Sequence, residues 1–179
     1  PGDYGGVALS EIISGEVNPT GRLPFTWPKH ASSHIPYFRK HTEDIHTDFS
    51  LNAFNPQFNF GDGLSYCQAS IDSITIDKSS YLIDDTIELT VSVSNKSDCD
   101  ATEIIQVYIS DLVASITPSV ERLRHYKKIN IGPNETLDFA MRIPLKDLGF
   151  IGIDNSYVIE SGRFKIRVNT FSKTFDLIK

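Results

Sequence analysis

The segment Thr86–Asn95, TIELTVSVSN, alternates between apolar and polar residues. Its apolar members occupy every second position: Ile87, Leu89, Val91 and Val93. Successive side chains of an extended chain point to opposite faces, so these four side chains share one face. A strand of this kind packs one side against a core and leaves the other side in water. The segment therefore predicts a half-buried β-strand, and it decides the class of the fold.

Six further segments read as strands and are separated by turn sequences such as NKSDCD and GPNE. They are IDSITI (71–76), EIIQVYIS (103–110), LRHYKKINI (123–131), LDFAMRIP (137–144), GRFKIRVN (162–169) and KTFDLIK (173–179). Seven strands within about 100 residues match an immunoglobulin-like sandwich in size and strand number. We therefore predict a mostly β fold, with a seven-stranded immunoglobulin or fibronectin III-like β-sandwich over residues 67–179.

The N-terminal region predicts a helix followed by a strand. In GGVALSEIISG (5–15), apolar residues recur at helical spacing: Ala8, Leu9, Ile12 and Ile13. Gly15 suits the left-handed position that ends a helix, and the prolines of RLPFTWP (22–28) favour an extended segment. One helix and one strand cannot bury their apolar faces alone. We expect residues 1–28 to be the end of a larger α/β domain, in a product cut or processed before Pro1.

Residues 29–66 predict a crossing loop between the two domains, because they lack a sustained period and exceed the usual loop length. The loop ends in FNFGDGLSY, Phe58–Tyr66. This stretch lacks the third glycine of a dinucleotide fingerprint, the Gly-Lys-Ser/Thr of a phosphate loop and the second glycine of a hydrolase elbow. We expect Gly61 and Gly63 to allow backbone conformations closed to other residues, where the chain bends into the sandwich.

The same loop holds the candidate binding residues. Four histidines lie in it, with acidic residues nearby: His30, His34, His41, His46, Glu43, Asp44 and Asp48. They lack the cysteines and tight spacing of structural zinc sites, so we predict no metal. Aromatic residues of the loop can stack on sugars, although packing between domains is the favoured role. We name Tyr37, Arg39 and His41 as candidate substrate contacts.

Composition limits the partners and the chemistry. The chain has 17 Lys and Arg against 23 Asp and Glu, a net charge of −6, which argues against nucleic acid. The most basic stretch, ERLRHYKK (121–128), is interpreted as an ordinary solvated strand. No apolar stretch is long enough to cross a bilayer, so no membrane partner is expected. Adjacent acids such as Asp84 and Asp85 are expected in solvated turns rather than as a catalytic pair.

The cysteines and two glycan-acceptor patterns carry weaker signals. Cys67 and Cys99 are too few for a disulfide framework and too far apart for a metal knuckle, so two free thiols are favoured, with a bond between them left open. NKS at Asn95 and NET at Asn134 fit the pattern of an N-glycosylation acceptor, a pattern that also arises by chance.

Three stretches carry a family resemblance. Residues 1–28 contain a Pro-Gly-x-x-Gly-Gly helix start, an Asn-Pro-Thr-Gly turn and a Leu-Pro strand; residues 58–66 contain Phe-Gly-x-Gly-Leu-Ser-Tyr. Residues 104–139 follow a pattern of strand, Asp, Pro, Leu and tight turn, with Asn134 in place of the usual turn glycine. Together they resemble the end of the α/β sandwich domain and the fibronectin type III-like domain of family 3 glycoside hydrolases, the β-glucosidase group.

The resemblance implies a retaining β-glycosidase that hydrolyses terminal β-glucosides or related β-glycosides through a covalent glycosyl-enzyme. In that family the catalytic Asp lies on a barrel domain and the acid/base Glu usually lies earlier in the α/β domain. The resemblance therefore implies no catalytic residue in this chain, a structural or cleft-supporting role, and inactivity alone. It implies no cofactor. The implied partners are the remaining domains of the parent hydrolase and, through them, a carbohydrate; a periplasmic or secreted location and a dimer fit the same interpretation.

Two other classes of function stay open at this stage. A free-standing carbohydrate- or protein-binding sandwich would bind through exposed aromatic side chains. A structural spacer or dimerisation domain would show a mass that depends on concentration.

Overall fold

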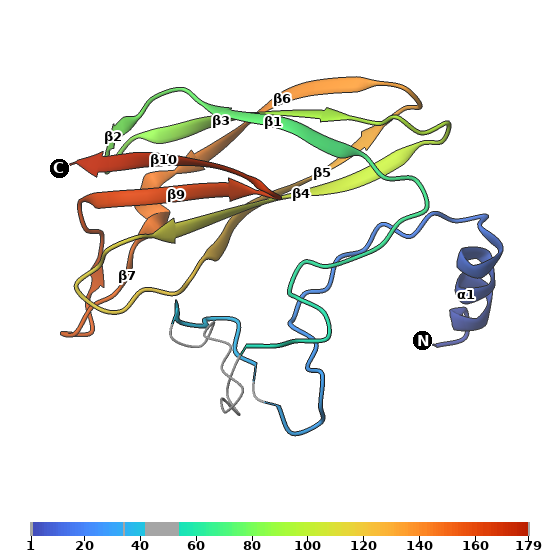
Figure 1. Cartoon of the computed structure of the whole chain (residues 1–179), viewed down its shortest axis with the longest axis horizontal. Helices are drawn as coiled ribbons and strands as arrows, with labels where there is room; N and C mark the ends of the chain where they lie inside the picture. Colours follow the sequence, from blue (N-terminus) through green and yellow to red (C-terminus); the bar gives the residue numbers. More distant parts are fainter. Residues whose placement is uncertain (1, 34, 42–53, 179) are drawn as a thin grey trace.

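The computed structural model describes residues 2–33, 35–41 and 54–178. Two sheets form a sandwich, with the helix at some distance from it (Figure 1). The three-stranded antiparallel sheet has the order β1 (Ser70–Ile76), β3 (Thr86–Ser94), β6 (Thr136–Pro144). The five-stranded sheet has the order β2 (Ser80–Leu82), β10 (Phe171–Ile178), β9 (Gly162–Val168), β4 (Ala101–Asp111), β5 (Arg122–Ile131). The mostly β class and the seven predicted strands are confirmed.

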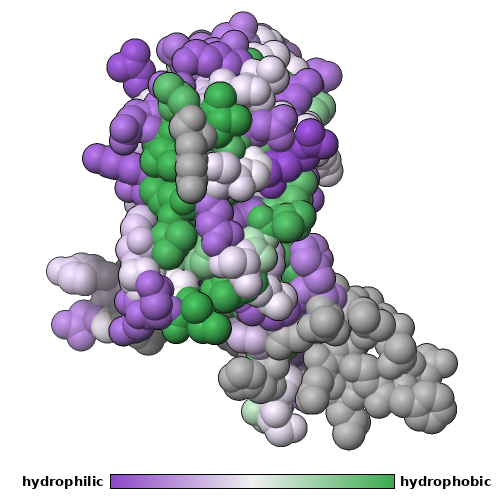
Figure 2. Space-filling model, turned by 90° about the vertical axis from the view of Figure 1, so that its left-hand side faces the viewer, coloured by the Kyte–Doolittle hydropathy of each residue, from purple (hydrophilic) through white to green (hydrophobic). Residues whose placement is uncertain are grey.

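Three short strands were not predicted from the sequence. β2 adds a parallel edge to β10, and β7 (Phe150–Ile151) pairs with β8 (Tyr157–Val158) in a small hairpin after the 3₁₀-helix η2 (Leu145–Leu148). The end of the sandwich that carries β2, β7 and the C-terminus shows hydrophobic side chains at its surface (Figure 2). Exposed members from these elements are Leu82, Ile151, Ile153, Tyr157 and Ile178. Among the described residues, no helix is long and apolar enough to span a bilayer.

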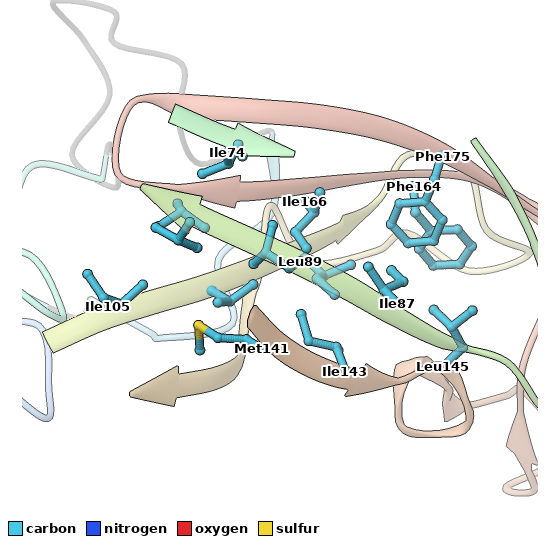
Figure 3. Close-up of a cluster of buried hydrophobic side chains, with 14 of the residues drawn as sticks. Ile74, Ile87, Leu89, Ile105, Met141, Ile143, Leu145, Phe164, Ile166 and Phe175 are labelled. Atoms are coloured by element: carbon cyan, nitrogen blue, oxygen red, sulfur yellow. The ribbon is translucent and has the colours of Figure 1, made fainter. Parts of the chain in front are cut away.

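The core lies between the two sheets, as the alternation in β3 requires. Ile87, Leu89, Val91 and Val93 have no exposed surface. In the adjacent strand, Met141 pairs with Leu89 and Ile143 with Ile87, so β3 and β6 present one continuous apolar face (Figure 3). The opposite sheet contributes Ile105 and Ile166, and Phe164 stacks on Phe175 with ring centroids 5.5 Å apart. Close packing of these side chains supplies the main stabilisation of the domain.

Tyr81 of β2 is the one tyrosine that lies wholly within this core among the described residues, with 1% of its surface exposed. Its hydroxyl donates to Asp77 Oδ1 at 2.8 Å and accepts from the Lys78 N–H at 3.0 Å. Burial, followed by the bond to Asp77, raises the pKa of Tyr81 to about 12. The hydrogen-bonded hydroxyl of Tyr81 thus helps to hold the three-residue strand β2 at the edge of the sheet.

Helix α1 (Gly5–Ser14) forms as predicted and ends at Gly15, whose φ of 83° is left-handed. No residue of α1 is buried; Leu9 is 58% and Ile13 72% exposed. The predicted strand over residues 22–28 is reduced to one bridge, between Trp27 and Phe58, because its partner is an irregular segment rather than a sheet. The helix-strand pair therefore presents apolar side chains without a layer of its own to bury them.

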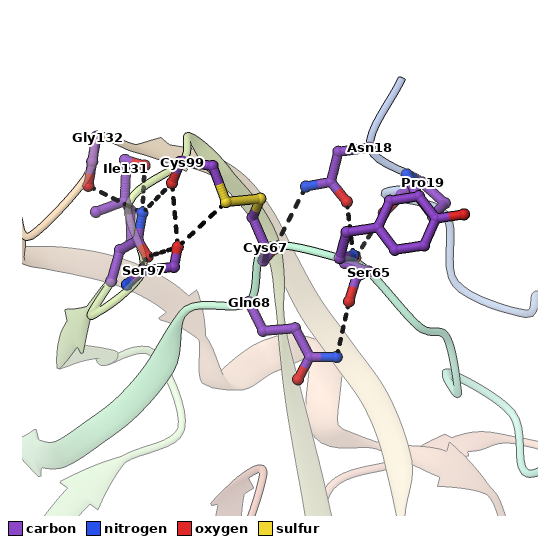
Figure 4. The surroundings of a disulfide bond; sticks show 11 residues. Asn18, Pro19, Ser65, Cys67, Gln68, Ser97, Cys99, Ile131 and Gly132 are labelled. Atoms are coloured by element: carbon purple, nitrogen blue, oxygen red, sulfur yellow. Dashed lines mark hydrogen bonds between the residues drawn. A yellow bond between two sulfur atoms is a disulfide. The ribbon is translucent and has the colours of Figure 1, made fainter. Parts of the chain in front are cut away.

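The expectation of two free thiols is wrong, because Cys67 and Cys99 form a disulfide bond (Figure 4). Cys67 lies just before β1, and Cys99 lies in the turn between β3 and β4. The antiparallel pairing of β1 with β3 brings these two points together, with Cα atoms 6.0 Å apart, inside the range that a disulfide requires. Sequence spacing of 32 residues gave no indication of this proximity.

Candidate functional site

A polar groove of about 580 Å³ lies between the crossing loop and the five-stranded sheet. In β4, Ile105, Val107 and Ile109 point into the core. The alternate residues therefore face away from the core, and they form one wall of the groove. The principal lining residues are Arg22, Tyr37, Arg39, Phe60, Gln106 and Tyr108.

The sheet wall of the groove is a connected hydrogen-bond network. The Tyr108 hydroxyl donates to Gln106 Oε1 at 2.5 Å, and the guanidinium carbon of Arg167 lies 4.5 Å from the Tyr108 ring centroid. Glu121 accepts two bonds from Arg167, at 2.8 and 2.7 Å. Burial raises the pKa of Tyr108 to about 12, although Arg167 acts in the opposite direction. Each polar group is thus committed to a neighbour, which makes this wall rigid.

Gly61 closes the groove from the loop side. Its φ is 85°, and Gln106 Nε2 donates to its carbonyl at 3.1 Å. A Cβ on Gly61 would meet the Gln106 side chain and the Tyr108 hydroxyl. The prediction for Gly61 is therefore confirmed. Gly63 has no positive φ; it is required because a Cβ there would collide with the carbonyl of Gly21 and the side chain of Arg22.

Residues 18–23 and 58–67, which we call the junction, are interlocked. The Tyr66 N–H donates to Asn18 Oδ1 at 2.9 Å, and Asn18 Nδ2 donates to the Cys67 carbonyl at 3.3 Å. Ser65 Oγ donates to the Pro19 carbonyl at 2.5 Å. Backbone bonds from Leu23 to Asp62 and from Gly61 to Leu23 continue the pairing. The Asn-Pro-Thr-Gly and Gly-x-Gly-Leu-Ser-Tyr motifs are thus the two halves of one structural element.

An ion pair joins the junction to the sandwich. Arg22 Nη2 lies 2.6 Å from Glu103 Oε1, and the two side chains are only 13% and 15% exposed. Tyr66 extends the contact to α1, since its hydroxyl donates to the Ile12 carbonyl at 2.8 Å. A buried, hydrogen-bonded ion pair fixes geometry more than it adds stability, because desolvation offsets much of the attraction.

Two of the three candidate substrate contacts meet in the groove. The Tyr37 ring lies 4.8 Å from the Phe60 ring, and its hydroxyl accepts from the Leu123 N–H at 2.7 Å. The guanidinium carbon of Arg39 lies 4.3 Å from the Phe54 ring centroid. His41 is exposed and does not line the groove.

The histidines do not make a metal site within the described part of the chain. In residues 2–33, 35–41 and 54–178, no three His, Cys, Asp or Glu side chains are grouped as metal ligands require. The structure does not describe five of the acidic and histidine residues considered as zinc ligands: His34, Glu43, Asp44, His46 and Asp48. The prediction about a zinc site in this loop therefore stays a prediction.

Sequence reasoning missed the charged members of the groove. Glu121 was interpreted only as part of a solvated strand, yet it accepts two bonds from Arg167. The description of residues 121–128 as an ordinary solvated strand also needs correction at Arg124. Its guanidinium donates to the carbonyls of Asp147 and Leu148, and burial lowers its pKa.

Models of two protein families match the chain along most of its length. The Glycosyl hydrolase family 3 C-terminal domain matches residues 1–66, and the Fibronectin type III-like domain matches residues 103–172. The chain belongs to glycosyl hydrolase family 3. The resemblance seen in the motifs is thereby confirmed. Both segments of the junction lie within the first match, apart from Cys67.

Relatives and solved structures agree with this family 3 assignment. A "Lysosomal beta glucosidase" of Dictyostelium discoideum is 32% identical over 94% of the chain, and a "Putative beta-xylosidase" of Formosa agariphila is 30% identical over 95%. The structure of a β-glucosidase involved in saponin metabolism from intestinal bacteria covers 99% of the chain with a TM-score of 0.90 and 29% identity. The chain spans 21%, 22% and 25% of the lengths of these three proteins.

Proposed function

We propose that this chain is the C-terminal part of a retaining β-glycosidase that hydrolyses terminal β-glucosides or related β-glycosides, and that its own role is structural and cleft-supporting. The observation that carries the proposal is the junction. Its hydrogen bonds join residues 18–19 to residues 65–67, where the sandwich begins, and the Arg22–Glu103 ion pair joins it to β4. A family 3 enzyme needs that arrangement if the sandwich is to support the domains that bind sugar.

The acidic side chains of the groove support a structural role. Retaining hydrolysis requires two carboxyl groups about 5–5.5 Å apart, one of which attacks the sugar while the other transfers a proton. Glu103 is held by Arg22, Glu121 is held by Arg167, and Asp62 accepts from the Asn59 N–H at 2.7 Å. Carboxylates engaged in this way brace the fold, so we assign no catalytic residue to the described chain.

We propose residues 1–28 as the end of the α/β domain, 29–66 as the crossing loop and 67–179 as the fibronectin type III-like sandwich. The exposed face of α1 supports the view that further domains of the same hydrolase are the partner, since Leu9 and Ile13 are largely exposed. A carbohydrate reaches the protein through those domains. The Cys67–Cys99 bond supports a periplasmic or secreted location, because disulfides persist in oxidising compartments.

The test compares aryl-β-glucoside hydrolysis by the complete protein and by this chain alone. We expect turnover by the complete protein and a rate at least about 10⁴-fold lower for the chain, the scale of loss when catalytic groups are absent. Aryl-β-xyloside in a parallel assay identifies the preferred sugar. Turnover by the isolated chain near that of the complete protein would show that the reacting carboxylates lie in it.

The groove favours a second candidate function, carbohydrate binding by the chain itself. Aromatic rings at Tyr37 and Phe60 beside polar side chains are the usual lining of a sugar site. Tyr37 and Arg39 remain our proposed contacts, with His41 as a peripheral one. Titration with cello- and xylo-oligosaccharides tests this: saturable binding that Arg39→Ala removes and Arg122→Ala retains would support it. A purely structural sandwich shows no saturation.

Self-association is a third proposal, and it concerns the hydrophobic end of the sandwich. Leu82, Ile151, Ile153 and Ile178 are all about half exposed or more. Sedimentation across a range of concentrations measures whether the chain dimerises, and Ile153→Lys should abolish any dimer that uses this end.

A further inference from the structure

The two glycan-acceptor sequences of the chain lie in opposite environments. Asn95, in Asn95-Lys96-Ser97, is 1% exposed. Asn134, in Asn134-Glu135-Thr136, lies with Pro133 in an exposed turn between β5 and β6, and Thr136 is the exposed first residue of β6. Both match the acceptor pattern for Asn-linked glycans, in which a hydroxyl residue follows two positions after Asn. Burial separates the two sites.

The Asn95 side chain is fully used inside the protein. Its Nδ2 donates to the carbonyls of Cys99, Ile131 and Gly132 at 2.8, 3.2 and 3.0 Å. Its Oδ1 accepts from the Ser97 hydroxyl at 2.6 Å. A glycan on Nδ2 would break these bonds and would need space where the protein is packed. A chain glycosylated at Asn95 therefore could not adopt this fold.

Asn134 has the geometry of a displayed acceptor. Its φ is 56°, and the Glu135 N–H donates to the Gly132 carbonyl at 3.3 Å, which closes a four-residue turn with Pro133 second and Asn134 third. This placement suits a type II turn, whose third residue needs a positive φ. Glu135 Oε2 accepts from the Gly132 N–H at 2.7 Å, so the turn is held without any contribution from the Asn134 side chain.

The disulfide supplies an independent indication of the compartment. Cys67–Cys99 and the Asn134 turn lie at the same end of the sandwich, where Asn95 bonds to both Cys99 and Gly132 (Figure 4). A disulfide of this kind forms in an oxidising compartment such as the lumen of the secretory pathway. Asn-linked glycans are added in that same compartment.

We propose that Asn134 is an N-glycosylation site of this protein and that Asn95 stays unmodified. The donor is a lipid-diphosphate-linked oligosaccharide, used by a separate glycosyltransferase. Nδ2 of Asn134 attacks C1 of the first sugar: an N–C bond forms, the C1–O bond to the diphosphate breaks, Nδ2 gives up one proton, and the lipid diphosphate leaves. The glycan then extends from the tip of the turn into solvent.

The test isolates the complete protein from the cells that make it and maps its peptides by mass spectrometry. Release with peptide N-glycosidase in heavy-oxygen water should convert Asn134 into labelled Asp, while the peptide that contains Asn95 keeps its Asn and carries no sugar. An Asn134 peptide without sugar in the mature protein would overturn the proposal, and so would a glycan on Asn95.

Two variants of the complete protein, made in the same cells, complete the test. Thr136→Ala removes the acceptor pattern but leaves Asn134 and the exposed turn, so it should lose the whole mass of one glycan. Thr136→Ser keeps the pattern and should keep the glycan. Equal glycan mass in the two variants would contradict the assignment. Because Thr136 is exposed, neither change is expected to prevent folding.

Discussion

At the scale of the residue, any side chain added at Gly61 would disturb the groove. An L-residue with its φ of 85° is strained, and the added Cβ would also press on Gln106 and Tyr108. We expect Gly61→Ala to lower the free energy of unfolding by at least about 1–2 kcal/mol. The measurement is urea unfolding of the chain.

Gly21→Ala is the matched control for this change. Gly21 lies in the same junction, has no positive φ, and a Cβ there would meet nothing within 4 Å. Its substitution should change stability by no more than about 0.5 kcal/mol. Equal effects at the two glycines would show that neither the left-handed backbone nor the crowding at Gly61 matters.

Tyr81 and Tyr108 set the behaviour of the protein at alkaline pH. Burial raises the pKa of each from 10.0 to about 12. The folded pKa lies above the unfolded value, so the stabilisation is complete below about pH 10 and is lost as pH rises toward 12. We expect a late rise in the phenolate absorbance from two tyrosines, and Tyr81→Phe and Tyr108→Phe should each remove the share of one. A late rise of unchanged size in both variants would contradict the assignment.

At the scale of elements, the side chain of Asn95 links the end of β3 to the end of β5 by hydrogen bonds. It supplies three donations to carbonyls from a side chain with almost no exposed surface. We expect Asn95→Ala to cost about 2–4 kcal/mol, because three carbonyls, of which that of Ile131 is buried, lose their side-chain donor. Thermal unfolding of the chain measures this. Lys96→Ala, at the exposed neighbour, should be neutral, and a similar loss there would assign the effect to the turn in general.

The seven longer strands were predictable from the sequence because they are rich in β-branched and aromatic residues, several alternate between apolar and polar residues, and turn sequences separate several of them. β3 is the clearest case: four aliphatic residues on one face admit no other period. β2, β7 and β8 are two or three residues long, too short for a period. β2 forms beside the longer strand β10, and β7 and β8 form by pairing with each other. The prediction therefore missed strands that tertiary contact makes, and it overstated residues 22–28, which form only the bridge between Trp27 and Phe58.

The groove was predictable only in part. Tyr37 and Arg39 were found because aromatic and cationic residues stand out in a loop. Gln106 and Arg167 lie on strands, and which strand faces the loop depends on how the crossing segment returns over the sheet. The disulfide was missed for the same reason, since a distance of 6.0 Å between Cα atoms arises from the pairing of β1 with β3.

At the scale of the whole molecule, several connections hold the junction and the crossing loop against the sandwich. They include the disulfide at Cys67, the Arg22–Glu103 ion pair and the bonds from Gln106 to Gly61 and from Leu123 to Tyr37. In contrast, α1 is attached through the Tyr66 hydroxyl and the neighbouring turn, with its apolar side chains exposed. The apolar side chains of α1 are therefore left uncovered by the described chain, as are those at the β2 and β7 end of the sandwich.

The exposed apolar side chains of α1 lead to a prediction that differs between the chain alone and the complete protein. In the chain alone, Leu9→Glu with Ile13→Glu should reduce self-association, because both side chains are exposed. In the complete protein, the same pair should lower the free energy of unfolding by at least about 3 kcal/mol and reduce aryl-glucoside turnover, since it places charge in a packed interface. Glu11→Lys alters the opposite side of the helix and should leave both properties unchanged. Light scattering of the chain, with thermal unfolding and turnover of the complete protein, measures the two effects. If the double variant leaves the complete protein intact, α1 has no partner layer there.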